Sequence, residues 1–348
     1  MRRLETLIIA LSLGFYVWFV WHFGPADVLG YIRLAGWGLV ITISLEAASR
    51  VLNTIAWRVT IGSYPKNLGF GELFVARIGG EAVDYITPSA QLGGQFVMAL
   101  AVRNKLRMPA GLASVVIAAL TEAIGQIMFV ALALVLSVHL LPGAANLFWP
   151  IAGGLSLAIA LALGLFWVQT RRPFSYLWKT AANFDFARIN KYEVKDSAAE
   201  ADQLLIDFYA NHRGRLALSC ALFFLAWSLG VVEIYILLHL LGVRATFTTA
   251  LLVDGLGNLI ERATFLVPAK LVSQEGGKAL ILALLGYPPG VGFVVGLLRR
   301  VKELAWVLAG LGGLAIHRAV VERPAAAASP PDSKMLEVPR APGGQSIL

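Results

Sequence analysis

The chain has 348 residues, of which 58% are hydrophobic and only 14% charged, and its formal net charge is +8. Soluble domains carry about 25% charged residues, so this composition excludes an ordinary soluble domain. The positive charge does not indicate binding to nucleic acid, because basic residues of membrane proteins gather in cytoplasmic loops. The single cysteine, Cys220, excludes a disulfide within the chain.

Apolar stretches along the chain predict about six full membrane spans. A helix that crosses a bilayer needs roughly 20 predominantly apolar residues. Stretches of this kind cover residues 4–21, 37–61, 111–140, 147–168, 216–241 and 291–316. The first is too long for the apolar region of a signal peptide and is interpreted as an uncleaved span. A β-barrel would show apolar and polar residues in alternation. The sequence therefore predicts an all-α polytopic membrane protein.

Two pairs of shorter segments interrupt these spans, each pair broken by a proline. The first pair covers residues 70–86 and 91–102 around Pro88, and the second lies around Pro268. Because neither segment of the first pair is long and apolar enough to cross alone, we expect re-entrant helical hairpins. With this topology most basic loops lie in the cytoplasm, together with both termini and the hydrophilic connection 170–214. A short amphipathic helix is expected at 197–209 within that connection.

The two hairpin regions show the same order of features. Four pairs of residues are each 180 positions apart, namely Gly62 and Gly242, Glu81 and Glu261, Pro88 and Pro268, and Pro109 and Pro289. Chance is the alternative explanation, since proline and glycine are common in membrane helices. We interpret residues 37–140 and 216–317 as two inverted repeats within a membrane domain of residues 1–319. Inverted repeats with broken helices are a transporter architecture. The Pro- and Ala-rich tail 320–348 is predicted to be disordered.

Polar residues in the first hairpin region are candidates for a transport pathway. The stretch RIGGEAVDYITPSAQLGGQ begins at Arg77, and irregular or charged chain at membrane depth is tolerated only inside protein or along a wet cavity. If the segment is helical, Glu81, Asp84 and Tyr85 share one face, and the backbone N–H groups at Gly93 and Gly94 could meet a phosphate. Further candidates are Gln91, Gln95, Glu122 and Gln126, with Pro88 as a hinge. Alternatively, these groups satisfy one another and only fix the hairpin.

The second half contains a corresponding set. Its candidates are Glu261, Arg262, Lys270, Gln274, Glu275, Arg299, Arg300, Lys302 and Glu303, with Pro268, Gly276 and Gly277 as hinges. Charges at this depth mark functional sites by default, although a purely structural ion network is the alternative. Arg299 and Glu303 are four residues apart and can pair along one helix. The basic residues would attract an anionic headgroup, whereas the acids would bind a cationic group or relay protons. Glu46, Arg50 and Arg58 make a weaker case.

The stretches GGEAVDYITPSAQLGGQ, AALTEAIGQ and VPAKLVSQEGGKALILALLGYPPG, followed by LLRRVKELAW, resemble the lysylphosphatidylglycerol synthase transmembrane-region family of flippase-like proteins. The QEGG and RRVKE motifs also look like those of hopanoid-associated members. The resemblance covers residues 4–318 and implies movement of a lipid between leaflets. It places family motif positions on Glu81, Asp84, Pro88, Gly93, Gly94, Glu122, Glu261, Pro268, Glu275, Gly276, Arg299 and Arg300. Because no soluble transferase domain follows residue 318, lipid aminoacylation is not expected.

These observations predict a lipid translocase of the inner membrane that is not an enzyme and needs no cofactor or metal. The expected partner is an anionic, zwitterionic or aminoacylated phospholipid or a hopanoid, and an enzyme of lipid synthesis is a further candidate partner. One alternative is a membrane enzyme in which Glu81 and Asp84 supply acid–base chemistry. Another is a scaffold, without transport activity, for a complex that synthesises lipids.

Overall fold

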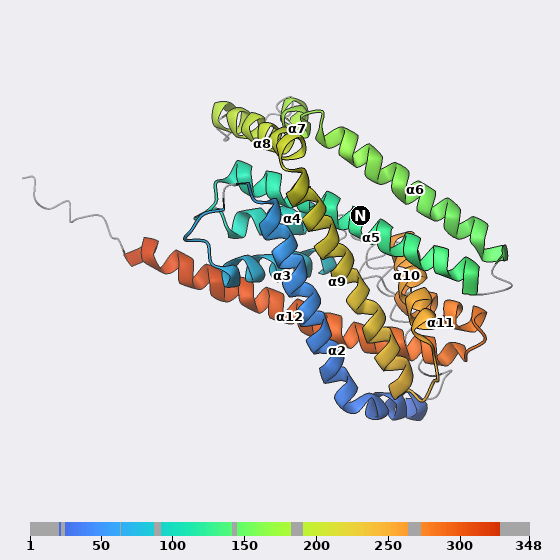
Figure 1. The fold of residues 1–348 in the computed structure, drawn as a ribbon. Coiled ribbons are helices and arrows are strands. Elements are labelled where there is room, and N and C mark those ends of the chain that lie inside the picture. Colours follow the sequence, from blue (N-terminus) through green and yellow to red (C-terminus); the bar gives the residue numbers. More distant parts are fainter. Residues whose placement is uncertain are drawn as a thin grey trace, which may run out of the picture.

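The computed structural model describes residue 21 and residues 25–62, 64–86, 92–140, 145–181, 191–263 and 273–327. Every regular element in these ranges is an α-helix (Figure 1). The predicted span at residues 4–20 and the predicted tail beyond residue 327 lie outside the described ranges. The same is true of Pro88, Gln91, Pro268 and Lys270, and of the side chain of Arg262.

The helices of the two halves follow the same order of a long helix, two short helices and a second long helix. In the first half these are α2 (Pro25–Thr60), α3 (Phe70–Ile86), α4 (Leu92–Ala101) and α5 (Met108–Leu140). In the second half they are α9 (Arg213–Leu240), α10 (Phe247–Ala263), α11 (Ser273–Leu284) and α12 (Pro289–Ala327). Between the halves lie α6 (Ala145–Gln169), α7 (Pro173–Ala181) and α8 (Lys191–Asn211). The short helices α3 and α10 have 17 residues each, which is about 26 Å and less than the roughly 30 Å of a bilayer core.

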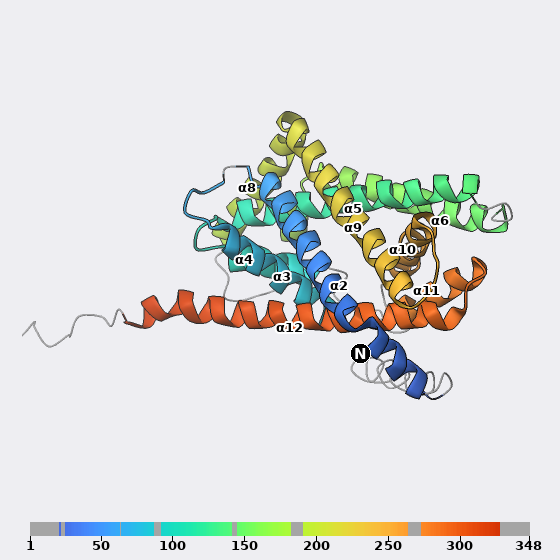
Figure 2. The same ribbon diagram turned by 60° about the horizontal axis from the view of Figure 1, so that its bottom comes forward.

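The two halves have opposite orientations. Helices α2 and α9 pack side by side and run in opposite directions (Figures 1 and 2). Helices α5 and α12 also run in opposite directions. Helix α3 packs on α12, and α10 packs on α5, so that each hairpin rests on the long helix of the other half. The arrangement is that of two inverted units, and their origin by duplication stays a prediction.

Four helices in the described part of the chain are long and apolar enough to cross a membrane. These spans are Gly36–Thr60, Met108–Leu136, Ala152–Gln169 and Arg213–Leu240, and they coincide with four predicted ones. Helix α12 is longer, with 39 residues, but it contains a group of four charged residues in its middle. It also continues to Ala327, past the boundary predicted at residue 320. The chain is thus a polytopic α-helical membrane protein.

Small residues allow the closest helix crossings, as is common in membrane bundles. A Cβ on Gly310 of α12 would lie 2.4 Å from the carbonyl oxygen of Ile78 on α3. A Cβ on Gly80 of α3 would lie 2.6 Å from the carbonyl oxygen of Gly94 on α4. A larger side chain at either glycine would therefore push two helices apart.

The hydrophilic connection forms the helices α7 and α8, and α8 includes the predicted helix 197–209. Leu205 and Phe208 of α8 are buried against α5. Asp202 accepts hydrogen bonds from the backbone N–H groups of Phe174 (2.9 Å) and Ser175 (2.8 Å) at the start of α7. A carboxylate there satisfies N–H groups that lack a partner within the helix. Burial raises the pKa of the phenol of Tyr209, which donates a hydrogen bond to Gln169 at the end of α6.

Candidate functional site: a charged cavity between the two halves

A cavity of about 660 Å³ lies between the halves and is lined by residues of α2, α3, α5, α6, α9, α10 and α12, with part of α4. Ten of the predicted site residues line it, namely Glu81, Asp84, Tyr85, Gln95, Glu122, Gln126, Glu261, Arg299, Lys302 and Glu303. The cavity is large enough for a polar headgroup, since small-molecule sites typically have about 300–1,000 Å³.

On the first half, acids and bases alternate along the cavity wall. Arg77 is 5% exposed, and it donates to Glu122 of α5 (2.8 Å) and to Glu81 one turn further along α3 (2.6 Å). Glu81 also accepts from Arg50 of α2, which in turn pairs with Glu46 at 3.0 Å. Each arginine thus lies between two carboxylates, which compensates for the cost of burying its charge.

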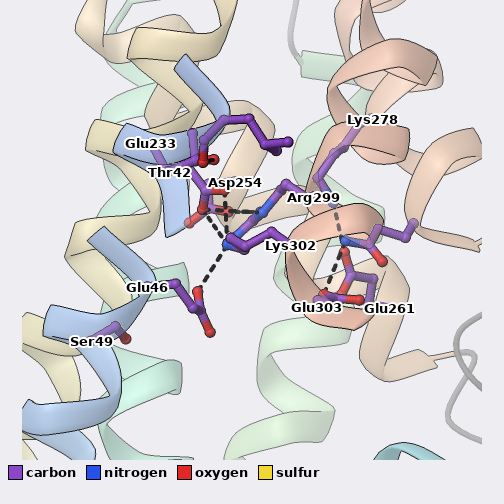
Figure 3. A network of polar contacts seen from close by, with 12 residues as sticks. Thr42, Glu46, Ser49, Glu233, Asp254, Glu261, Lys278, Arg299, Lys302 and Glu303 are labelled. Carbon is purple, nitrogen blue, oxygen red and sulfur yellow. Dashed lines mark hydrogen bonds and ion pairs between the residues drawn. The ribbon is translucent and has the colours of Figure 1, made fainter. Parts of the chain in front are cut away.

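The same alternation continues into the second half (Figure 3). Lys302 of α12 donates to Glu46 (2.8 Å) and to both carboxylate oxygens of Glu233 on α9 (2.7 and 2.8 Å). Arg299 pairs with Glu233 at 3.4 Å and donates to Asp254 of α10 at 2.6 Å. Nine side chains from six helices therefore form one continuous chain of alternating charge, which runs from Glu122 through Glu46 to Asp254.

Two further ion pairs lie beside this chain. Lys278 of α11, which is fully buried, donates to Glu261 at 2.7 Å. Arg300 donates to both oxygens of Glu275 (2.6 and 3.2 Å) and to the hydroxyl of Tyr85 (3.0 Å). Arg300, Glu275 and Lys278 do not line the cavity. The pair of Lys278 and Glu261 joins α11 to α10 within the second hairpin, whereas Arg300 joins α12 to α11 and to α3.

Several polar atoms at the cavity have no hydrogen-bond partner among the described residues. Glu303 accepts a hydrogen bond from Gln274 at 3.2 Å and also interacts with the hydroxyl of Tyr85, while its oxygen Oε2 is buried and has no hydrogen bond of normal geometry among the described residues. The same holds for Oδ2 of Asp254, Nδ2 of Asn258 and Nε1 of Trp306. Because buried polar groups without partners cost about 1–3 kcal/mol each, such atoms at a cavity need hydrogen bonds from water or from a polar ligand that occupies it.

Two side-chain or backbone groups have other partners in the structure than the sequence predicted. Arg299 pairs with Glu233 and Asp254, not with Glu303, because both acids reach it from neighbouring helices. The backbone N–H of Gly94, predicted to meet a phosphate, donates to Asp84 Oδ1 at 2.7 Å at the start of α4. A carboxylate is favourable there because it meets the positive end of the helix dipole.

The two predicted hinge glycines of the second hairpin lie inside a helix. Gly276 and Gly277 belong to the first turn and a half of α11, and their role as hinges stays a prediction. A Cβ on Gly277 would lie 3.3 Å from Cγ2 of Ile260 on α10. The absence of a side chain at Gly277 therefore serves the packing of α10 against α11.

Sequence reasoning did not select five members of the charged chain as site residues: Glu46, Arg50, Arg77, Glu233 and Asp254. Glu46, Arg50 and Arg58 make only a weaker case in the sequence, and of these three Arg58 is exposed and lies over the ring of Tyr64. Glu233 and Asp254 could have been selected from the sequence, because each is a single acid within an apolar stretch of a membrane helix, and such acids mark functional sites. Arg77 lies one turn before Glu81, a spacing that favours pairing.

The helical bundle, with four helices long and apolar enough to cross a membrane, defines a polytopic membrane protein with a charged cavity among its helices. A family model described as "Lysylphosphatidylglycerol synthase TM region" matches residues 6–312. The chain therefore belongs to the lysylphosphatidylglycerol synthase transmembrane-region family, and it is a membrane protein involved in lipid handling. No curated protein and no solved structure matches the chain.

Proposed function

We propose that the protein is a lipid translocase of the inner membrane, and that it acts as a transporter and not as an enzyme. The polar headgroup of the lipid occupies the cavity while its apolar chain stays at the bilayer. The observation that carries this proposal is a cavity of about 660 Å³ with charged walls inside a membrane-spanning bundle. Charged groups at membrane depth cost several kcal/mol unless they are paired or hydrated, and they commonly line substrate pathways.

The charges favour a headgroup with a positive group. Among the described residues that line the cavity, eight are acidic and four are basic: Glu46, Glu81, Asp84, Glu122, Glu233, Asp254, Glu261 and Glu303 against Arg50, Arg77, Arg299 and Lys302. All four basic residues are already paired with carboxylates. Glu303, by contrast, forms no ion pair with a base among the described residues, and its hydrogen-bond partners there are the neutral side chains of Gln274 and Tyr85. An ammonium group of a headgroup would complete its charge-assisted hydrogen bonding.

Translocation in reconstituted vesicles tests the proposal. Fluorescent analogues of lysylphosphatidylglycerol, phosphatidylethanolamine and phosphatidylglycerol are compared by the fraction that an external reductant can quench. We expect the protein to accelerate movement of the lysyl-lipid most and of the anionic lipid least. If no lipid moves faster than in vesicles without protein, the translocase proposal is wrong.

A matched pair of variants tests the role of Glu303. Glu303→Gln keeps the shape but removes the charge, and we expect it to slow the lysyl-lipid about tenfold, the effect of losing one charge-assisted hydrogen bond. Glu72→Gln is the control, since Glu72 lies outside the cavity and pairs with Lys105. Equal rates for cationic and anionic lipids, together with full activity of Glu303→Gln, would refute the preference for a positive headgroup.

A further inference from the structure

Helix α6 forms the apolar wall of the cavity. Its 25 residues include no charged side chain, whereas α2, α3, α5, α9, α10 and α12 all contribute ion-paired residues to the other walls. Leu161, Ala162 and Leu165 of α6 line the cavity. Leu161 is 65% exposed and Leu165 is 42% exposed, so this wall lies where the cavity meets the surface of the bundle.

At its end near Gln169, α6 is attached to α8 by a polar contact and a ring contact. There Gln169 accepts the hydrogen bond of Tyr209, and the ring of Phe166 contacts that of Tyr209 with centroids 5.2 Å apart. Towards α10 the approach is apolar, because a Cβ on Gly154 would lie 3.2 Å from Cδ2 of Leu259. Helix α6 packs mainly on α5 and only slightly on α10, so parting α6 from α10 at this point mainly separates Gly154 from the apolar side chain of Leu259. Parting any two of the ion-paired walls would separate buried charges.

We propose that the apolar chain of the transported lipid lies against α6 and leaves the cavity through the seam between α6 and α10, which is formed by Gly154, Leu161, Leu165 and Leu259. This inference rests on the proposed function. The occupant is an acyl or polycyclic chain because each CH₂ placed among apolar side chains or lipid gains about 0.8 kcal/mol. The charged walls offer no such gain, and the exposed α6 wall is continuous with the headgroup cavity. The seam therefore holds the chain while the headgroup moves.

A reversible cross-link across the seam tests this. Cys220 is the only cysteine, so Cys220→Ser provides a cysteine-free background for Gly154→Cys with Leu259→Cys. Cγ of Leu259, where the sulfur of a cysteine at this position would lie, is 3.8 Å from the Cβ position of Gly154. A disulfide needs about 3 Å between these two atoms, so a shift of roughly 1 Å closes the bond. We expect the oxidised protein to move the lysyl-lipid at least about tenfold more slowly, and a thiol reductant to restore the rate.

The control pair is Gly153→Cys with Leu259→Cys in the same background. A Cβ on Gly153 meets nothing within 4 Å, so this pair should not form the disulfide and should keep its rate under oxidation. A cross-linked seam with an unchanged transport rate would show that the chain does not pass between α6 and α10.

A second measurement does not depend on transport. A lysyl-lipid with a photoreactive group near the end of its acyl chain is activated in vesicles, and its adducts are mapped by mass spectrometry. We expect adducts at Leu161, Leu165 and Leu259 that an excess of unlabelled lysyl-lipid removes. Leu308 of α12 is 71% exposed and lies outside the cavity, so adducts there report bulk lipid and should resist competition.

The two experiments separate the two proposals. If the wild-type protein moves lipid, but the cross-link does not slow it and the adducts on α6 resist competition, the seam is wrong and the translocase proposal stands. If no lipid moves but the adducts on α6 are removed by competition, the seam binds lipid chains and the translocase proposal fails.

Discussion

Replacing Arg77 by methionine is the most direct perturbation of the charged chain. Arg77 is buried and is the only base that pairs with Glu122 among the described residues, whereas Glu81 also pairs with Arg50. The variant Arg77→Met fills a similar volume but leaves the carboxylate of Glu122 without a cation. Removing one partner from a buried ion pair costs about 3–5 kcal/mol. Because the side chain of Glu122 is 24% exposed, we expect a loss near the lower end, about 3 kcal/mol.

A double-mutant cycle measures this coupling as a free energy of unfolding. Glu122→Gln alone leaves Arg77 paired with Glu81 and should cost only about 1 kcal/mol. The double variant Arg77→Met/Glu122→Gln buries no unpaired carboxylate and should be more stable than Arg77→Met alone. The assay is unfolding in mixed micelles of increasing dodecyl sulfate content, followed by circular dichroism. Additive effects of the two substitutions would contradict the pairing, since residues in direct contact should couple by about 0.5–3 kcal/mol.

The same assay needs a control arginine within a helix. Arg58 of α2 is exposed and lies over the ring of Tyr64, with 4.4 Å between its guanidinium carbon and the ring centroid. An exposed cation–π contact of this type contributes about 0.5–1 kcal/mol. If Arg58→Met destabilises the protein as much as Arg77→Met does, burial and ion pairing do not explain the effect at Arg77.

Two other substitutions probe packing and helix capping. Gly310→Ala places a Cβ against the Ile78 carbonyl and should destabilise the α3–α12 crossing by about 1–3 kcal/mol. Gly312→Ala in the same helix meets nothing within 4 Å and should be neutral or stabilising by up to about 1 kcal/mol; the same unfolding assay decides, and equal losses for both would contradict the close crossing. Asp202→Ala removes both hydrogen bonds to the start of α7 and should cost about 0.5–2 kcal/mol locally. Limited proteolysis between residues 170 and 190 should become faster, and an unchanged cleavage rate would exclude the capping role.

The spans and hairpins were predictable because hydropathy and helix breakers act locally along the chain. The span predicted at 37–61 is found at Gly36–Thr60, and that at 216–241 is found at Arg213–Leu240. Helices α3 and α10 end at Ile86 and Ala263, before the two prolines that marked the predicted hairpins. Proline disfavours the helical conformation of the residue directly before it, so each proline predicts that a helix does not continue through that position.

The ion-pair partners were not predictable in the same way. Spacing within one helix suggested that Arg299 pairs with Glu303, but Arg299 contacts acids of α9 and α10. Likewise the partners of Lys302 are Glu46 of α2 and Glu233 of α9. These contacts join residues far apart in the chain, and sequence periodicity reports only neighbours on the same helix. The residues of the cavity could be proposed from their charge and depth, whereas their pairing depends on how the two halves pack.

The distribution of these pairs bears on how the halves could move relative to each other. Lys302 and Glu46 join α12 to α2, but Lys302 also has Glu233 and Glu46 also has Arg50. The hydrogen bond from Arg300 to Tyr85 also joins the halves, and Arg300 keeps Glu275 if that bond breaks. Opening either contact therefore leaves no buried charge without a partner, which would otherwise cost about 3–5 kcal/mol. Breaking the pair of Arg77 and Glu122 within the first half, by contrast, orphans Glu122. Among the ion pairs, those that join the halves can therefore open without orphaning a charge, whereas the packing of α2 on α9 and of α3 on α12, with the hydrogen bond from Ser219 to the carbonyl of Ala56, also holds the halves together.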